Sequence, residues 1–272
     1  MAMPLPILQS STQPTASDLI RFFHQTERDW TRHTSEETPL DVGTAFHNAE
    51  LADVWDANCV LDAVLPEDAT PEQALDETTS HFRSAGSTCR KWIMNPSAPQ
   101  ERTQPLIEHI IAQGYREMRR DIMYLAHMPT TPIHEVGGIK IIPARASYRH
   151  ARQLAEEDAA RWNTPALADA KMMHLDDPHF DSMMALKDGE AVATAGVLAM
   201  GEIGRIESVF VSEKYRRLGF GKTMMSRAME ICARSLFKHV LLCLSADNVA
   251  ARALYTQVGF TKIGELVEYV KE

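Results

Sequence analysis

The chain has 272 residues, of which 44% are hydrophobic and 24% are charged, and its formal net charge is −9. This composition is typical of a globular protein of about two domains and excludes a disordered or collagen-like chain. The longest apolar run, residues 191–200, is far too short to cross a bilayer, and no signal-like segment opens the chain, so we expect no membrane partner and no secretion.

The first half of the chain, residues 1–130, shows helices and strands in alternation. We expect helices at 17–32, 71–85 and 104–113, and strands at 43–46, 58–65, 89–94 and from 116 through 124. Residues 1–135 carry 10 basic and 20 acidic side chains, which argues against a nucleic-acid partner. The acidic balance suits a cationic substrate or partner, although a solvated acidic surface is the interpretation that we prefer.

A Pro/Thr-rich stretch followed by two glycines predicts an interdomain linker at 131–138. Beyond it, in the predicted second domain at 139–272, we expect strands at 139–143, 180–186, 191–200, 204–211, 239–245 and 260–271. Helices are expected at 147–160, 165–175, 222–235 and 248–258. An Asp-Gly pair at 188–189 predicts a hairpin turn between two of these strands. The fold class is therefore mixed α/β, with a central sheet flanked by helices.

The segment that follows the strand at 204–211 predicts an anion site. Gly219 and Gly221 let the backbone approach a bulky ligand without interference from a Cβ atom. The helix that begins near Lys222 directs unsatisfied N–H groups and the positive end of its dipole toward this turn. Four nearby side chains add positive charge: Lys214, Arg216, Arg217 and Lys222. These features indicate a site for a phosphate or pyrophosphate. The spacing matches neither the Walker A loop nor the dinucleotide fingerprint.

The order Arg216-x-x-Gly219-x-Gly221 resembles the acyl-CoA signature of the GNAT superfamily of N-acyltransferases. A second segment, Asn248-x-x-Ala251-x-x-x-Tyr255 followed by Gly259-Phe260, is similar to the family's second signature. The resemblance covers residues 137–272 and implies a GNAT fold with a mixed, mostly antiparallel sheet. It also implies acetyl-CoA as cosubstrate, without a metal.

The resemblance implies which residues hold the cosubstrate. The pyrophosphate is expected on the backbone of the glycine turn, and the pantetheine arm along the motif strand where that strand splays away from its neighbour. The amide of Val209 or Phe210 would then polarise the thioester carbonyl. The expected cofactor-binding residues are Val209, Phe210, Val211, Arg216, Arg217, Leu218, Gly219, Phe220, Gly221, Lys222, Thr223, Asn248 and Ala251.

Two catalytic residues are expected. Tyr255 lies at the family's position for the acid that protonates the departing thiolate. Glu207 is the acidic residue of the motif strand, two residues before Val209, and alternation places it on the face of Val209 and Val211. Glu207 is either the general base or a structural residue, in a salt bridge or at a solvated strand end.

The first half resembles a degenerate GNAT-like domain, as in tandem GNAT proteins, because its order of elements is similar and the segment from Leu106 to Gly114-Tyr115 echoes that from Leu254 to Gly259-Phe260. It lacks a counterpart of the glycine turn, so we expect no acyl-CoA site there and expect a fragment starting near Thr131 to bind acetyl-CoA if it stays folded. An unrelated α/β domain is the other interpretation.

These features favour a cytoplasmic N-acetyltransferase that acts on a small-molecule or peptide amine by direct attack. A non-catalytic acyl-CoA-binding regulator, another acyl donor and a hydroxyl acceptor remain alternatives, and the oligomeric state is open. The four cysteines, Cys59, Cys89, Cys232 and Cys243, are widely spaced and suit a reducing compartment. The histidines show no metal-site spacing. We expect His174, His179 and Trp162, near the acceptor region, to serve packing or the surface.

Overall fold

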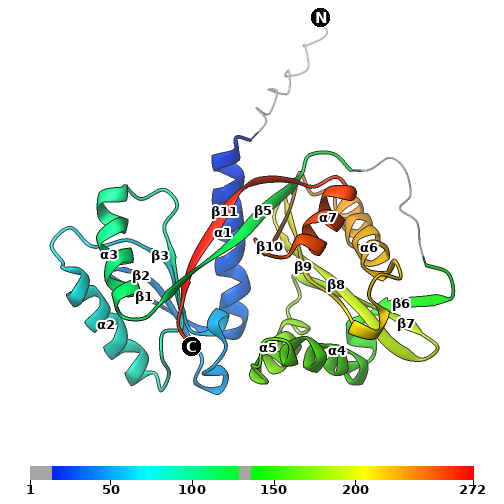
Figure 1. The fold of residues 1–272 in the computed structure, drawn as a ribbon, viewed down its shortest axis with the longest axis horizontal. Coiled ribbons are helices and arrows are strands. Elements are labelled where there is room, and N and C mark those ends of the chain that lie inside the picture. Colours follow the sequence, from blue (N-terminus) through cyan, green and yellow to red (C-terminus); the bar gives the residue numbers. More distant parts are fainter. Residues whose placement is uncertain (1–13, 129–135) are drawn as a thin grey trace, which may run out of the picture.

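A computed structural model describes residues 14–128 and 136–272. Its strands form one eleven-stranded sheet in the order β1-β2-β3-β4-β11-β5-β10-β9-β8-β7-β6. Figure 1 shows two lobes, one from each half of the chain, bridged by the long strands β5 and β11 with α1 beside them. Most of the predicted linker, residues 131–135, lies outside the described residues. No helix in the described ranges has the length and apolar character needed to cross a membrane.

The first lobe contains three helices and the strands that precede β5. Its elements are α1 (Ala16–Thr34), β1 (Glu36–Leu40), β2 (Gly43–His47), β3 (Cys59–Ala63), α2 (Pro71–Ser84), β4 (Lys91–Met94), α3 (Gln100–Ala112) and β5 (Arg116–Leu125), with short 3-10 turns at Ala49–Leu51 and Trp55–Ala57. Thr15 and Thr70 cap α1 and α2, each through a reciprocal capping box. The sequence did not predict β1, an edge strand that contains Pro39 and lacks an apolar alternation.

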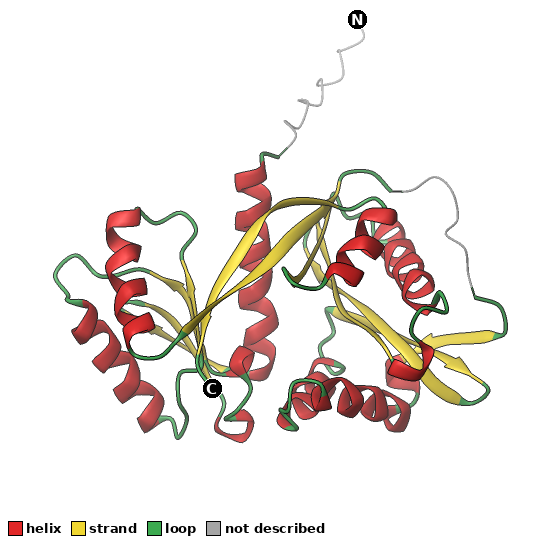
Figure 2. Ribbon diagram, viewed as in Figure 1, coloured by secondary structure: helices red, strands yellow, loops and turns green. Residues whose placement is uncertain are grey.

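The second lobe follows the predicted order closely. Its elements are β6 (Ile139–Pro143), α4 (Tyr148–Ala160), α5 (Ala166–His174), β7 (Phe180–Lys187), β8 (Glu190–Met200), β9 (Ile203–Val211), α6 (Phe220–Arg234), β10 (His239–Ser245), α7 (Val249–Gln257) and β11 (Thr261–Val270), with short 3-10 turns at Ala144–Ala146 and Glu213–Tyr215. The turn between β7 and β8 has positive φ at both Asp188 and Gly189, as a tight hairpin requires. Figure 2 shows helices on both faces of the sheet.

The two halves exchange their last strands. β5 belongs to the first half but pairs with β10 over six residue pairs, from Val240↔Leu125 to Ser245↔Arg120. β11 ends the second half but pairs with β4 of the first. β5 and β11 also pair with each other. The two halves are therefore parts of one continuous sheet.

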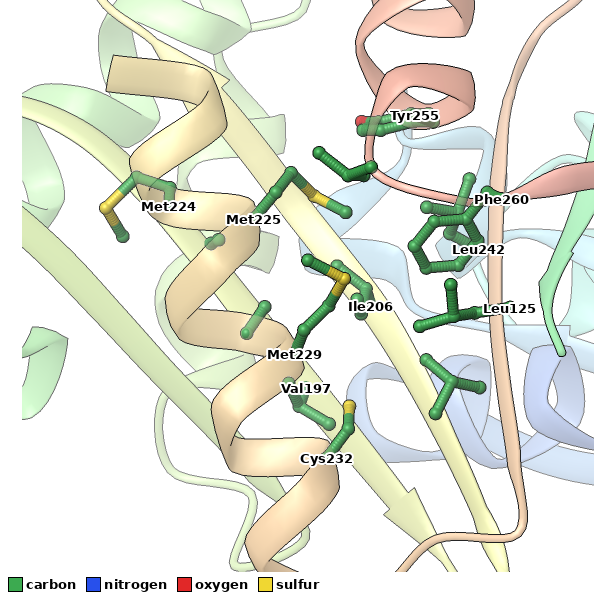
Figure 3. Packing of buried hydrophobic residues seen from close by; sticks show 14 of the residues in the cluster. Leu125, Val197, Ile206, Met224, Met225, Met229, Cys232, Leu242, Tyr255 and Phe260 are labelled. Atoms are coloured by element: carbon green, nitrogen blue, oxygen red, sulfur yellow. The ribbon is translucent and has the colours of Figure 1, made fainter. Parts of the chain in front are cut away.

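Side chains follow the exchanged strands into the opposite core. Met123 and Leu125 of β5 are buried in the main core of the second lobe, where the methionines of α6 pack on β8 and β9 (Figure 3). Tyr269 of β11 is buried in the core of the first lobe, beside Trp92. Burial of this apolar surface contributes roughly 1.5–3 kcal/mol per side chain, so each core depends on the other half of the chain.

The two lobes share the same order of strand directions around the β5/β11 pair. β3 runs parallel to β4, as β9 runs parallel to β10, and the remaining neighbours in both lobes are antiparallel. β3 and β9 each contain one residue with positive φ, Asp62 at 56° and Ser208 at 53°. This correspondence supports the expected similarity between the two halves.

Candidate functional site

The sheet opens between β9 and β10. These parallel strands pair from Ile203↔His239 to Ile206↔Leu242 and no further, although β9 continues to Val211 and β10 to Ser245. Beyond Leu242, β10 stays paired with β5 on its other side. The segment 207–211 of β9 therefore presents its backbone to an open split, which is the arrangement expected for binding an extended, amide-containing ligand.

A bulge at Ser208 shapes this segment. The register between β8 and β9 jumps from Gly196↔Glu207 to Thr194↔Phe210, and Ser208 adopts φ 53°. The extra residue reverses the alternation of side chains. Ile206, Val209 and Val211 face the core under α6, whereas Glu207 points to the opposite side. The predicted shared face of Glu207 with Val209 and Val211 is therefore wrong.

The glycine turn ends in the N-terminus of α6. Arg217 has φ 65° and Gly219, the N-cap residue, has φ 90°. Within the described ranges, the backbone N–H groups of residues 217–222 donate to no acceptor, and the first helical bond runs from Thr223 to Gly219. Free amides at a helix N-terminus are suited to bind an anion. The turn therefore has the backbone geometry that an anion site needs, and the site itself stays a prediction.

The side chains of the turn have different roles. Arg216 donates to the carbonyl of Val211 over 3.3 Å, and Lys214 is held by Glu190 at 2.7 Å. Phe220 is buried in the core, so only its backbone faces the turn. Leu218 is exposed and offers apolar surface at the turn, and Val249 at the start of α7 is exposed as well.

Two predicted contact residues have structural roles that the sequence did not reveal. The hydroxyl of Thr223 is buried and accepts the N–H of Val136 at 3.1 Å. A Cβ atom on Gly221 would come within 3.2 Å of Leu254, so this glycine allows α6 to approach α7. At Gly219 the positive φ accounts for the glycine.

Helix α7 places Tyr255 beside the split. Asn248 caps the helix by accepting the N–H of Ala251 at 3.0 Å. Tyr255 is 7% exposed, and burial raises its pKa, with further contributions from Glu207 and Cys243. Tyr255 packs in one cluster with Leu242 of β10 and Val209 of β9, so the tyrosine lies close to both strands of the split. Figure 3 shows its ring at the edge of the core, near Phe260.

Glu207 is a member of an ion pair, as one of its two predicted roles required. Its Oε1 accepts from Nε of Arg205 at 2.5 Å, and its side chain is 15% exposed. Arg205 is itself buried against α1, where it contacts Glu27 and Thr26. No hydrogen bond to Oε2 of Glu207 is present among the described residues, so this oxygen is the one that a ligand can use.

A cavity of about 40 Å³ lies beside the bulge, under α4 and α5. Its lining is mostly apolar, with Ser208 at one end and the ion pair of Asp158 and Lys171, 2.8 Å apart, at its wall. His174 lies outside it, stacked on Trp30 with ring centroids 3.5 Å apart, and His179 and Trp162 are exposed. The expected packing role of His174 is consistent with this geometry.

The corresponding position in the first lobe lacks these features. There the loop after β3 is acidic, and α2 begins with the Thr70 capping box and Pro71, which leaves fewer free amides. The pairing of β3 with β4 continues to Ala63↔Met94, so no split opens. These contacts favour the predicted absence of an acyl-CoA site in this lobe.

Several residues of the site were not predicted. Arg205 and Glu27 form the ion pairs behind Glu207, and buried Asp121 of β5 holds Arg252 of α7 at 2.6 Å. A charged residue inside an apolar strand is a signal that could have identified Arg205. The pairs Arg205–Glu27 and Asp121–Arg252 join residues 178 and 131 positions apart in the sequence, and no local pattern indicates them. No cluster of three or more metal-binding side chains occurs in the described ranges.

Comparison with known proteins identifies the second lobe. Residues 146–260 match the model of the acetyltransferase (GNAT) family. This part of the chain is a GNAT acetyltransferase domain. The match supports acyl transfer, with an acyl-CoA as the family's usual donor.

Solved structures extend the likeness to the whole chain. A GCN5-related N-acetyltransferase from Kribbella flavida has a TM-score of 0.60 at 14% identity, covering 92% of this chain and 95% of the other. A functionally unknown conserved protein from Staphylococcus epidermidis has a TM-score of 0.59 at 13% identity, with coverages of 88% and 94%. A tandem GNAT protein from the clavulanic acid biosynthesis pathway has a TM-score of 0.54 at 14% identity, with coverages of 95% and 97%. The predicted tandem GNAT fold is confirmed.

Proposed function

We propose that this protein transfers an acetyl group from acetyl-CoA to a primary amine by direct attack. The observation that carries the proposal is the split between β9 and β10, which leads to the free amides at the N-terminus of α6. One feature suits a pantetheine arm and the other a pyrophosphate. The residues present therefore fit an acyl-CoA.

The backbone of β9 would orient the thioester. N–H groups of the segment around Val209 and Phe210 that face the split are free to hydrogen-bond the carbonyl oxygen. As the amine attacks, negative charge develops on that oxygen, and fixed amide donors stabilise it without reorganisation. The side chains of Val209 and Phe210 are packed on opposite faces, which holds this backbone rigidly in place.

Glu207 would prepare the acceptor. An amine enters as an ammonium ion and must lose one proton before it attacks. Oε2 of Glu207 can take this proton and pass it to solvent. The C–N bond then forms and the C–S bond breaks. The second amine proton passes to the departing sulfur, so the products are the amide and the thiol of CoA.

Tyr255 would assist the leaving sulfur. Because burial, Glu207 and Cys243 raise the pKa of Tyr255, its hydroxyl stays protonated at neutral pH. Its pKa then exceeds that of an ordinary thiol, about 8.5. Complete proton transfer from tyrosine to thiolate is therefore uphill, and a hydrogen bond from the hydroxyl to the developing thiolate is the favoured interaction.

The acceptor would approach from the side of α1, α4 and α5. The cavity beside Ser208 opens there, and its mostly apolar wall suits the carbon skeleton of a small aliphatic amine or of a peptide side chain. Neither a membrane nor a nucleic acid is needed by this proposal.

The proposal is tested by measuring CoA release with a panel of amines, amino acids, polyamines, aminoglycosides and peptides, together with calorimetry of acetyl-CoA. We expect micromolar binding and turnover with at least one amine class. Binding without turnover on any amine or alcohol would favour the non-catalytic regulator. Absence of acetyl-CoA binding would refute the proposal. Turnover with only a longer acyl donor, or with only a hydroxyl acceptor, would show that the proposed donor or acceptor is wrong.

A further inference from the structure

A row of alternating charges is buried between the two lobes, on the face of the sheet covered by α1. Lys91 contacts Asp56 and lies 3.5 Å from Glu268, which in turn is 3.2 Å from Arg120. Arg205 then joins two carboxylates, Glu27 and Glu207, each at 2.5 Å. The row thus consists of two groups of ion pairs, one of Asp56, Lys91, Glu268 and Arg120 and the other of Glu27, Arg205 and Glu207.

The two groups of ion pairs form one electrostatic unit. Burial alone would raise the pKa of Glu27, but Arg205, Lys91 and Arg120 lower it below its ordinary value. Burial would lower the pKa of Arg120, but Cys243, Glu268, Glu27 and Glu207 raise it well above its usual range. Charges in such a row are expensive to bury unless each has a partner.

The row contains four carboxylates and three cations, so it holds one surplus negative charge. One end, Asp56, has a half-exposed side chain. The other end, Glu207, reaches the split between β9 and β10 and is the terminal carboxylate of the row. A cation bound at Oε2 of Glu207 would make the row neutral.

Glu27 shares Arg205 with Glu207. Arg205 is 1% exposed, and its guanidinium is held by Glu27, by Thr26 at 3.0 Å and by the ring of Phe23 at 4.6 Å from its centroid. All three partners belong to α1 of the first lobe. The orientation of Arg205, and through it that of Glu207, therefore depends on the first half of the chain.

We propose that Glu27 is a positioning residue for the acceptor site: through Arg205 it orients Glu207 and leaves the buried row with one negative charge that selects a cationic amine. This inference rests on the proposed acetyltransferase function. It assigns the first lobe a part in acceptor binding, although that lobe has no predicted acyl-CoA site.

The charge arrangement explains how an ammonium can be bound and then deprotonated. Binding of the ammonium makes the row neutral, and transfer of its proton to Glu207 leaves the total charge unchanged. Without the charge of Glu27, Arg205 would neutralise Glu207 alone, and the row would neither attract the ammonium nor accept its proton as readily.

Several titratable groups surround Glu207 and Glu27. Arg205 on β9, Arg120 on β5 and Tyr255 on α7 interact with Glu207. Cys243 on β10 interacts with Glu27. Glu27 also faces His24 on its own helix, and Lys91 and Asp56 act on it from the first lobe. Any pH dependence must be compared with variants that leave these groups in place.

The test uses Glu27→Gln, which keeps the size of the side chain and removes its charge. With the best amine from the acceptor panel, we expect KM for the amine to rise about tenfold at pH 7. The acidic limb of kcat/KM against pH should move to lower pH by about one unit, because Arg205 then stabilises the ionised form of Glu207 more strongly. Affinity for acetyl-CoA should not change.

Two further variants make the result decisive. Asp29→Asn removes a carboxylate that pairs with Arg32 on the surface of the same helix, outside the row, and should leave KM and the pH profile unchanged. Glu27→Asp keeps the charge and should restore the acidic limb toward its original position. If circular dichroism shows that Glu27→Gln is poorly folded, Glu27→Asp provides the comparison instead.

The outcomes separate this inference from the proposed function. Loss of acetyl-CoA binding or turnover in the unaltered protein concerns the proposed function. If the unaltered protein is active while Glu27→Gln matches Asp29→Asn in amine KM and pH profile, the positioning role of Glu27 is wrong. If Glu27→Gln and Glu27→Asp move the acidic limb equally, the charge of Glu27 is not what matters and the inference also fails.

Discussion

Each half of the chain, produced without the other, should be unfolded, because the last strand of each half is paired only with the other half. In a piece comprising residues 136–272, β11 loses both of its neighbours, β4 and β5, and β10 loses β5. In residues 1–135, β5 likewise loses β10 and β11. A strand without neighbours leaves its backbone groups to water and contributes nothing to a core.

The magnitude follows from the side chains that these strands bury. Each exchanged strand contributes three buried apolar side chains: Ile122, Met123 and Leu125 from β5, and Leu266, Tyr269 and Val270 from β11. At roughly 1.5–3 kcal/mol each, three such side chains are worth about 5–9 kcal/mol per piece. Whole domains are stable by only about 5–15 kcal/mol. In addition, Arg252 and Lys262 would lose their ion pairs with Asp121.

The assay compares the two pieces alone, the two pieces mixed, and a full chain with a protease site introduced between residues 128 and 136. Each piece alone should show no cooperative thermal transition and no acetyl-CoA binding by calorimetry. The cleaved full chain should elute as one complex and retain both properties. A cooperative transition with full acetyl-CoA affinity for residues 136–272 alone would refute the reasoning and would restore the expectation of an independent second domain.

Three further outcomes are expected. Tyr255→Phe should lower kcat about 10²-fold, the cost of removing one fixed donor, with acetyl-CoA affinity unchanged by calorimetry; near-normal kcat would mean that water stabilises the leaving sulfur. Gly219→Asp should weaken acetyl-CoA binding at least about tenfold through charge and backbone strain, whereas Gly201→Asp, at another positive-φ turn with open space around it, should not; equal affinities would remove the pyrophosphate from this turn. Burial lowers the pKa of His174 to about 3. The contribution of the neutral side chain to the free energy of unfolding is therefore fully present above about pH 6.5, and it is lost as the pH falls toward 3. His174→Phe should reduce the difference in unfolding free energy between pH 7 and pH 4.5 by about 2–3 kcal/mol in urea titrations, and an unchanged difference would show that another group controls acid unfolding.

Local patterns in the sequence predict the elements and the glycine turn. The helices and most strands have clear periodicity or capping residues, and Gly219 has the positive φ that favours glycine. Gly221, in contrast, is explained by the packing of α6 on Leu254 of α7. Strand β1 was missed because Glu36, Glu37 and Pro39 give it no apolar alternation, and its pairing with β2 decides its conformation.

Non-local contacts account for what the sequence did not predict. No local pattern in the sequence reveals the exchange of β5 and β11, because each of these strands could equally pair within its own half of the chain. The face of Glu207 was predicted wrongly because one bulge residue, Ser208, reverses the alternation on which the prediction relied. The ion pair of Glu27 with Arg205 joins residues 178 positions apart, and only the packing of α1 on β9 brings them together.

The strand exchange also affects how the protein can be made. Leu266 of β11 lies opposite Arg120 of β5, 146 residues earlier in the chain. At a synthesis rate of 5–20 residues per second, a ribosome needs about 7–30 s to cover this distance. For most of that time β5, which has three consecutive buried positions, has emerged without either of its neighbours, β10 and β11. Such long-range pairing is slow to form and leaves strand edges open to association with other chains. Expression of this protein should therefore depend on chaperones that hold the first half until the last ten residues or so have been synthesised.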